Sequence, residues 1–256
     1  MKEGNGGGAA APPARKRKKR RKKRYLLKAA IVLALIAGAG FFMSSSFFDI
    51  QNITVENSRH YTAEQIIEKS GAKIGVNLIW EDVGGLRDRL MSDPYIRNVK
   101  TRRALPSELV IRVSERQEEA FVSGNGSHIV IDGEGVALRR TDVAPALTEF
   151  ANVKATRAEE GRPLEAEDNT SFADALNLLK AAKKNELYFK KIDISNIMVR
   201  AYIYDDLVCE GAFGHIMDNM GDLRATLEWL DAQGTDRGTI KIGEGITWQP
   251  LIDQAE

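Results

Sequence analysis

Ten consecutive basic residues, Arg15 to Arg24, lead directly into nineteen residues, Tyr25 to Met43, that carry a single charge at Lys28. At about 1.5 Å per residue, a helix of this length reaches about 28 Å, close to the roughly 30 Å hydrocarbon core of a bilayer. Lys28 lies within a turn of the basic end, so its ammonium group can reach the headgroups. The pattern predicts a membrane-spanning helix with a serine run, residues 44–46, at the far interface.

The basic run also predicts the orientation of that span. Clustered Lys and Arg beside a span stay on the cytoplasmic side, which places residues 44–256 outside the cytoplasm. Residues 1–24 hold 11 Lys and Arg against one acid, whereas residues 44–256 hold 25 Lys and Arg against 35 acids. We expect contact with anionic lipid from a set of eleven cations: Arg15, Lys16, Arg17, Lys18, Lys19, Arg20, Arg21, Lys22, Lys23, Arg24 and Lys28.

Two alternatives to a retained signal anchor are a nucleic-acid-binding segment and a cleaved signal peptide. A Lys/Arg run can bind nucleic acid through counterion release, but this run abuts a span and has no interleaved aromatic residues. Ala37-Gly38-Ala39 fits the small-x-small rule for signal peptidase cleavage. The basic region is longer than such signals carry, and apolar residues continue through Met43, so the anchor is the favoured interpretation.

The remaining chain suits one or two folded domains. We expect a disordered basic tail over 1–24, a signal anchor over 25–46, two domains over 47–116 and 117–250, and a short tail over 251–256. Residues 1–14 are rich in Gly, Ala and Pro and cannot bury a core. Cys209 is the single cysteine, which excludes an intrachain disulfide and suggests a small buried apolar side chain.

Residues 50–113 show a compact α/β pattern. A β-rich stretch, 50–55, precedes a capping box in which Thr62 caps a helix and Gln65 reaches back to it. Gly71 predicts a left-handed helix end. A second helix is expected over 82–91, followed by strands over 96–103 and 109–113. The expected order is therefore β-α-α-β-β.

At this point the chain resembles the FtsQ/DivIB cell-division family and its POTRA domain. The resemblance rests on six segments: Phe48-Asp-Ile50, Ile53-Thr-Val-Glu-Asn57, Gly75-Val-Asn-Leu-Ile79, Pro94-Tyr-Ile-Arg-Asn-Val99, Leu105-Pro106 and Leu109-Val-Ile-Arg-Val-Ser-Glu-Arg116. The last resembles the family signature P-x-x-L-x-I-x-V-x-E-R. The family's proline after that signature is missing, because Gln117-Glu-Glu-Ala120 stands there, and this departure bears on the interdomain hinge.

The second domain is expected to be a mixed, mainly antiparallel β-domain with flanking helices, so that the fold class is α+β. A strand-turn-strand unit over 128–138 contains the segment Asp132-Gly-Glu-Gly135. We interpret this segment as a tight turn, because it lacks the 12-residue ligand series of a calcium loop. A helix is expected over 171–184, capped by Asp168 or Thr170, and one strand over 192–204 with a bulge near Asn196. Further elements are a strand over 207–213, a helix over 222–231 and final strands over 238–243 and 246–250. The family's final Asp is replaced here by Thr239, so any role of that carboxylate lapses.

Three short motifs and three histidines are the candidates for an enzymatic site. Ser70-x-x-Lys73, Ser123-Gly-Asn125 and Lys241-Ile-Gly243 mimic the motifs of penicillin-recognising enzymes. The helix end predicted at Gly71 breaks the geometry that Ser70 and Lys73 would need. The three histidines, His60, His128 and His215, lack the spacing of a zinc site. We therefore expect no catalytic residue, no metal and no cofactor.

The resemblance implies a non-enzymatic scaffold at the division septum that helps control septal peptidoglycan synthesis. Its implied partners are single-span coiled-coil proteins of the FtsB/DivIC and FtsL type and, with them, the septal peptidoglycan synthase complex. In the family these partners dock at the end of the β-domain, where an edge strand can accept a partner strand. The candidate residues are Ile240, Lys241, Ile242 and Trp248, with Tyr202 and Tyr204 as neighbours.

Several alternatives stay open at this level. Ile242 and Trp248 could pack the core, and Lys241 could be a solvated surface charge. The acidic surplus of residues 44–256 suits a partner with basic residues near its binding segment. Rival functions are a POTRA-bearing translocation or secretion module, which usually carries several POTRA repeats and a β-barrel, and a ligand-binding ectodomain, which would require a concave apolar pocket.

Overall fold

A computed structural model describes residues 8, 19–124, 126–194 and 198–251. The chain separates into two compact units. Unit 1 comprises residues 1–53, 73–81 and 103–109, and unit 2 comprises residues 54–72, 82–102 and 110–256. Most of the predicted disordered tail over 1–24, nearly all of the tail over 251–256 and the bulge near Asn196 lie outside the described residues. Residues 19–24 of that predicted tail belong to the helix α1.

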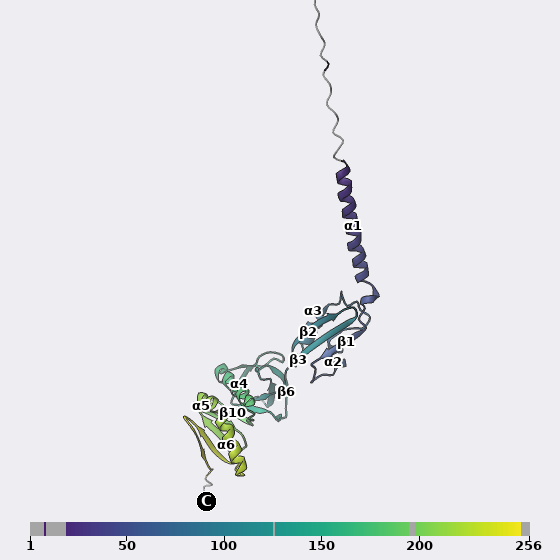
Figure 1. The fold of residues 1–256 in the computed structure, drawn as a ribbon. Coiled ribbons are helices and arrows are strands. Elements are labelled where there is room, and N and C mark those ends of the chain that lie inside the picture. The colour runs from purple at the N-terminus through teal and green to yellow at the C-terminus, as the bar shows by residue number, and fades with distance from the viewer. Residues whose placement is uncertain (1–7, 9–18, 125, 195–197, 252–256) are drawn as a thin grey trace, which may run out of the picture. The chain divides into compact units, whose positions relative to one another are not determined.

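The first element is the long helix α1 (Lys19–Met43), which contains the predicted span (Figure 1). Its segment Arg24–Met43 has 20 residues, and none of its described side chains is buried. A helix that is apolar and exposed on all sides suits a lipid environment and no protein core. Within the described residues it is the one helix long and apolar enough to cross a bilayer. A short 3-10 helix, η1 (Ser46–Phe48), follows it.

The next five elements follow the predicted β-α-α-β-β order. They are β1 (Asn52–Glu56), α2 (Ala63–Ser70), α3 (Val83–Met91), β2 (Ile96–Ala104) and β3 (Glu108–Glu115). The strands form a three-stranded sheet in the order β1-β3-β2, so the last strand lies in the middle. The central strand is the most buried of the three, in keeping with its apolar run from Leu109 to Val113.

The helix ends in this region obey the local signals of the sequence. Thr62 Oγ1 accepts the Gln65 N–H at 3.3 Å, and Gln65 Oε1 accepts the Thr62 N–H at 2.9 Å, which completes the predicted capping box. Gly71 ends α2 with φ of 72°, in the left-handed region. Asp82 caps α3 by accepting the Gly85 N–H at 2.9 Å. The caps at Thr62 and Gly71 were predicted from residue type, whereas Asp82 was predicted only as the approximate start of the second helix.

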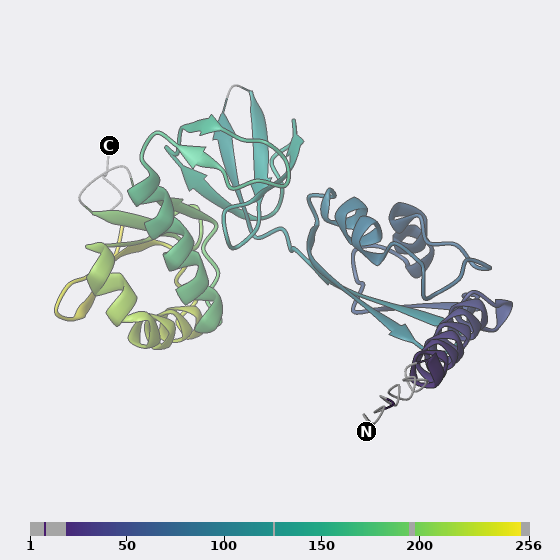
Figure 2. The ribbon, with the colours of Figure 1, turned by 90° about the horizontal axis from the view of Figure 1, so that it is seen from above.

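The rest of the chain is built on a nine-stranded sheet with the order β14-β13-β12-β11-β10-β7-β4-β5-β6 (Figure 2). Three neighbouring pairs, β12–β13, β7–β10 and β4–β7, are parallel and the others are antiparallel, which confirms the predicted mixed, mainly antiparallel sheet. The strands are β4 (Ala120–Gly124), β5 (Ser127–Ile131), β6 (Ala137–Thr141), β7 (Thr148–Ala151), β10 (Lys191–Asp193), β11 (Val199–Tyr202), β12 (Leu207–Gly211), β13 (Gly238–Ile242) and β14 (Ile246–Gln249). A separate two-stranded ribbon is formed by β8 (Ala155–Arg157) and β9 (Glu165–Ala166).

Three helices, α4 (Asn169–Lys184), α5 (Phe213–Asp218) and α6 (Met220–Ala232), cover one face of this sheet (Figures 1 and 2). Their apolar sides and one face of the strands form a single core. One register row crosses nearly the whole sheet on that face: Trp248, Ile240, Cys209, Ala201, Ile192, Phe150, Val122 and Ile129. All of these side chains except that of Trp248 are buried. Because neighbouring residues in register share a face, this row packs as one hydrophobic layer.

The predicted strand over 192–204 was wrong, because the segment forms two strands instead of one. β10 pairs antiparallel with β11, with Lys191 opposite Tyr202, so the chain reverses direction between them. Both halves alternate apolar and polar residues, and period-2 alternation does not reveal a reversal inside a run. The prediction also extended the next strand to Phe213, which instead begins α5. Strands β4, β7, β8 and β9 were not predicted.

The final hairpin depends on a close approach between two residues. Gly238, at the start of β13, has φ of 132°, and a Cβ placed there would lie 2.6 Å from both Trp248 Nε1 and the Gln249 carbonyl oxygen. β14 is the outermost strand, so this contact joins it to the rest of the sheet. A side chain at position 238 would push the Trp248 indole and the end of β14 away from β13.

We therefore expect Gly238→Ala to lower the free energy of unfolding by about 1–3 kcal/mol, from backbone strain and overpacking. The measurement is the urea midpoint of the full chain in detergent micelles, followed by tryptophan fluorescence. Gly243→Ala is the matched control, because a Cβ there meets no atom within 4 Å. Equal midpoint losses in the two variants would contradict the steric explanation.

Candidate functional site

The outermost strand β14 is the clearest candidate surface for pairing with another chain. It pairs antiparallel with β13, with Ile240 opposite Trp248 and Lys241 opposite Thr247. In the part of the chain that the structure describes, no strand pairs with its other side. An edge strand presents unpaired N–H and C=O groups along its free side. The sequence predicted this location for partner binding, and whether a partner binds there stays a prediction.

The six residues predicted for this site do not share one surface. Ile240 and Ile242 have 0% and 3% of their surface exposed, and both face the helix-covered core. Lys241 lies between them in sequence and is exposed on the opposite face. Tyr202 is half-buried in β11, two strands away from β13, and the exposed Tyr204 follows the end of β11. The structure thus places Lys241 beside β14 but not the two tyrosines.

Trp248 lies in β14 but points to the core side. Its side chain is half-buried and packs against the core, and its indole Nε1 is buried without a hydrogen-bond partner among the described residues. A buried unpaired N–H costs about 1–3 kcal/mol. The indole is also the group that a Cβ at position 238 would meet. Trp248 therefore anchors the edge strand to the domain.

The face opposite the helices is open across strands β10 to β14. Two register rows cross it: Thr247, Lys241, Glu210, Arg200 and Asp193 in the first, and Gln249, Thr239, Val208, Tyr202 and Lys191 in the second. None of these ten side chains is buried. Arg200 pairs with Glu210 at 3.2 Å, and the Lys191 ammonium lies 5.4 Å from the centroid of the Tyr202 ring. We call these ten residues the open face.

The sequence contained a signal for this arrangement. Gly238-Thr-Ile240-Lys-Ile242 alternates strictly, so Ile240 and Ile242 must share a face opposite Lys241. Thr247 and Arg200 were missed because their membership of the same surface depends on strand order. Strand order joins residues about fifty positions apart in the chain and leaves no mark on local periodicity.

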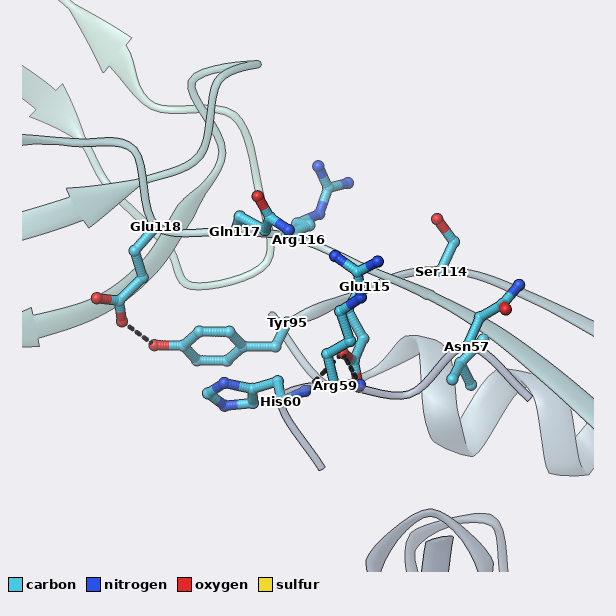
Figure 3. Close-up of a pocket in the computed structure, with 10 residues that line it drawn as sticks. Asn57, Arg59, His60, Tyr95, Ser114, Glu115, Arg116, Gln117 and Glu118 are labelled. Carbon is cyan, nitrogen blue, oxygen red and sulfur yellow. Dashed lines mark hydrogen bonds between the residues drawn. The ribbon is translucent and has the colours of Figure 1, made fainter. Parts of the chain in front are cut away.

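A second surface feature is a groove of about 500 Å³ beside the end of β3 (Figure 3). It is lined by Asn57, Arg59, His60, Tyr95 and residues 113–118. Figure 3 shows the Tyr95 and His60 rings next to each other and the hydrogen bonds that join the Glu115 carboxylate to the backbone of Arg59 and His60. The imidazole of His60 stacks on the Tyr95 ring at 4.1 Å between centroids and 7° between planes.

Glu115 fixes the loop that precedes α2. Its carboxylate accepts the N–H groups of Arg59 and His60 at 2.7 Å each and the Ser58 hydroxyl at 2.9 Å. Partial burial would raise the pKa of the Glu115 carboxyl, but these donors outweigh it and leave the pKa below its usual range. The carboxylate is thus a structural acceptor for a loop more than fifty residues away.

Glu118 and Tyr95 form the other polar contact of the groove. The Arg139 guanidinium donates to Glu118 at 2.6 Å, and the Tyr95 hydroxyl donates to it at 2.6 Å. The bond from Arg139 is the main cause of the lowered pKa of Glu118. Burial and the bond to Glu118 raise the pKa of Tyr95 to about 12. Both carboxylates that line the groove therefore already bind protein groups.

Arg116, the last residue of the signature, pairs with the turn at Asp132. The Arg116 Nη1 lies 2.6 Å from Asp132 Oδ2, and both side chains are largely buried. The other carboxylate oxygen accepts the N–H groups of Glu134 and Val136 at 2.9 and 2.8 Å. Asp132 is thus occupied by its own turn and by Arg116, which confirms the tight-turn interpretation over a calcium loop.

Two of the residues that suggested an enzyme, Ser70 and Ser123, make structural contacts. Ser70 is the last residue of α2, and its buried hydroxyl donates to the Ile67 carbonyl at 2.7 Å. Ser123 Oγ lies 3.0 Å from His128 Nδ1 and 3.2 Å from a Glu149 carboxylate oxygen, so the carboxylate contacts the serine instead of orienting the imidazole. Asn125 lies outside the described residues. Across the described part of the chain, no three His, Cys, Asp or Glu side chains gather as metal ligands.

The predicted lipid-contacting cations are described only in part. Arg15 to Lys18 lie outside the described residues, and Lys19 to Lys23 form the first residues of α1. Arg24 and Lys28 are exposed on that helix. Contact of this run with anionic lipid stays a prediction.

Comparison with known proteins gives one family model and several similar proteins. A model of the FtsQ-type POTRA domain matches residues 48–116. "Cell division protein DivIB" of Clostridium acetobutylicum is 26% identical over 181 residues, 69% of this chain and 72% of that protein. DivIB of Clostridium tetani is 24% identical over 59% of this chain and 58% of its own length. "Cell division protein FtsQ" of Syntrophotalea carbinolica is 35% identical over 79 residues, 31% of this chain and 28% of that relative.

The contacts of Glu115 generate a prediction about stability and pH. Glu115→Gln should lower the free energy of unfolding at neutral pH by about 1.5–3 kcal/mol, because charge-assisted hydrogen bonds to the loop are lost. The folded-state pKa of Glu115 is lowered, so its contribution is present above the unfolded value of about 4.3 and is lost as pH falls through the folded value.

Urea midpoints of the full chain between pH 7 and pH 3 provide the measurement. Wild type should lose stability on acidification more steeply than Glu115→Gln, so that the two curves converge at low pH. Glu68→Gln, at an exposed glutamate of α2, serves as the control and should run parallel to wild type. A gap that stays constant down to pH 3 would rule out the assigned role of the carboxylate.

Proposed function

Because the chain belongs to the FtsQ/DivIB family of bacterial cell division proteins, we propose that it is a non-enzymatic single-span scaffold of the divisome. In this proposal it binds other division proteins and helps control septal peptidoglycan synthesis. The partners are single-span coiled-coil proteins of the FtsB/DivIC and FtsL type, together with the septal peptidoglycan synthase complex. The N-terminus is cytoplasmic and the folded domains are extracytoplasmic, as the basic run before α1 favours.

The free side of β14 is the observation that carries the partner-binding part of the proposal. Within the described residues, β14 pairs on one side alone and is only four residues long. A partner segment that pairs with it would extend the sheet through main-chain hydrogen bonds, which depend little on side-chain identity. Pairing of this kind accommodates partners whose sequences diverge while the geometry of the edge is kept.

Side chains next to the edge would supply specificity. Alternate residues of an added strand would fall on the two faces of the sheet. On the helix-covered face they would meet the half-buried Ile246 and Trp248 and the helix α6, which contacts β14. On the other face they would meet Thr247 and Lys241, both of which are exposed. An apolar and polar alternation in the partner segment fits both surfaces.

The burial pattern also decides which variants are informative. Ile242 is buried and Trp248 anchors β14, so Ile242→Asp and Trp248→Ala would damage the fold together with any binding. Thr247 is exposed in the middle of β14 and can be replaced without disturbing the core. Arg140, exposed on β6 at the opposite edge of the same sheet, offers a matched position.

The test is photo-crosslinking of the full chain in cells, with p-benzoylphenylalanine placed at Thr247 or at Arg140. We expect covalent products with the coiled-coil division proteins from position 247 and none from position 140. Products from position 140 alone, or equal products from both, would exclude β14 as the binding edge. Absence of division proteins from every product would count against the scaffold function itself.

A further inference from the structure

We propose that the folded part of unit 1 carries a second membrane contact, made by three loops that meet at the end of α1. The loops are residues 46–51, 73–81 and 103–107, and all of them belong to unit 1. They carry five exposed apolar side chains, each with 38% to 68% of its surface accessible. We call this set the basal patch: Phe47, Ile74, Val76, Trp80 and Leu105. The occupant of the patch is the boundary between headgroups and acyl chains of the bilayer that α1 crosses.

The first loop turns back onto the span itself. Ser44 and Ser45 N–H groups bond to carbonyls in the last turn of α1, and η1 follows directly. This turn stacks the Phe47 ring on Phe42 at 5.9 Å and brings Phe48 edge-on to Phe42 at 5.4 Å. Phe42 belongs to the membrane-spanning segment, so the ring of Phe47 lies at the depth of the last turn of the span.

The second loop is tied to the same end of α1 by side-chain hydrogen bonds. Asn77 Nδ2 donates to the Met43 carbonyl at 3.0 Å and to the Ser45 carbonyl at 3.3 Å. Trp80 Nε1 donates to Ser44 Oγ at 3.3 Å. The main chain supports this arrangement, because the Leu78 N–H donates to the Phe48 carbonyl at 2.7 Å. Residues 77–80 therefore lie within one hydrogen bond of the residues that end the span.

The third loop is fastened to the other two. Arg103 donates through Nε to the Leu78 carbonyl and through Nη2 to the Glu81 carbonyl, each at 2.8 Å. The Gln51 N–H donates to the Ser107 carbonyl at 2.8 Å. Leu105 occupies the turn between these two anchor points, and 64% of its surface is exposed.

The length of the span sets the depth of the patch. Arg24–Met43 contains 20 residues, which span about 30 Å, the thickness of the hydrocarbon core. Met43 then lies at the hydrocarbon edge, and groups bonded to Met43 and Ser44 lie in the interfacial layer of roughly 5–7 Å on that side. Trp is enriched in this layer because its ring is apolar and its N–H is polar.

Charges in the loops indicate a hydrophobic contact instead of an electrostatic one. The three loops carry the cations Lys73 and Arg103 and the anions Asp49 and Glu81, and so have no net charge. A contact of this kind requires no anionic lipid and resists salt, in contrast to the basic run at the other end of α1. It would hold the folded part of unit 1 in a fixed orientation on the bilayer. The proposal rests on the span and not on the division function.

The test uses the full chain in phosphatidylcholine vesicles, with a doxyl group near the headgroup end of the acyl chain as the lipid-phase quencher and iodide as the aqueous quencher. The chain has three tryptophans, and Trp229, exposed on α6, is the comparison for Trp80. Lipid-phase quenching should be largely lost in Trp80→Phe and retained in Trp229→Phe. Added salt should not change it.

A second variant tests the patch apart from Trp80. Ile74→Asp with Leu105→Asp changes two exposed side chains, so the fold should persist while lipid-phase quenching of Trp80 falls and iodide quenching rises. Quenching of Trp80 by iodide alone in the wild-type chain would overturn the proposal, as would lipid-phase quenching that the double variant leaves unchanged. Either result would leave the crosslinking experiment at Thr247 unaffected, so the two proposals fail separately.

Discussion

Crossing the bilayer once is the constraint on which the rest of this molecule depends. A span of about 30 Å requires an uninterrupted apolar helix, since no backbone group can remain unpaired in hydrocarbon. α1 satisfies this with exposed apolar side chains on every side. The end of the span then becomes a fixed point for unit 1, because Asn77 and Trp80 bond directly to the residues that follow it. The first folded loops are therefore tied to the end of α1.

The nine-stranded sheet is covered by helices on one face, while its other face is open across strands β10 to β14. On the helix-covered face, a register row from Ile240 to Ile129 is buried without a break, which gives the domain its hydrophobic core. On the other face, strands β10 to β14 present charges and hydroxyl groups that pair locally, as Arg200 does with Glu210. Ile246 and Trp248 pack one face of β14 against the core. The outer side of β14 stays free because β14 is the last strand in the sheet order. Trp248 packs this strand against the core, and a side chain at position 238 would collide with its indole.

Three charged side chains in unit 2, described above, join segments that are distant in sequence. Glu115 binds the 58–61 loop, Glu118 binds Tyr95 and Arg139, and Arg116 binds the Asp132 turn. The lowered pKa values of Glu115 and Glu118 express these bonds, because each donor stabilises the ionised form. The Glu-Arg pair at the end of the signature thus has a structural explanation in this chain. It directs one charge back to the loop before α2 and the other forward to the β5–β6 turn.

The sequence by itself determined the features that depend on neighbours in the chain. Hydropathy and charge predicted the span, residue types at helix ends predicted the boundaries at Thr62 and Gly71, and the order of patterns predicted the β-α-α-β-β arrangement. The signature segments gave the family. Tertiary structure alone decided which strands are neighbours, where the chain reverses between β10 and β11, and which strand lies at the edge. It also separated Lys241 from Ile240 and Ile242 by face and gave Trp248 its place in the core. The physical reason is that capping and periodicity act over a few residues, whereas strand order and burial arise from contacts between distant residues, such as Ser58 and Glu115, which are 57 positions apart.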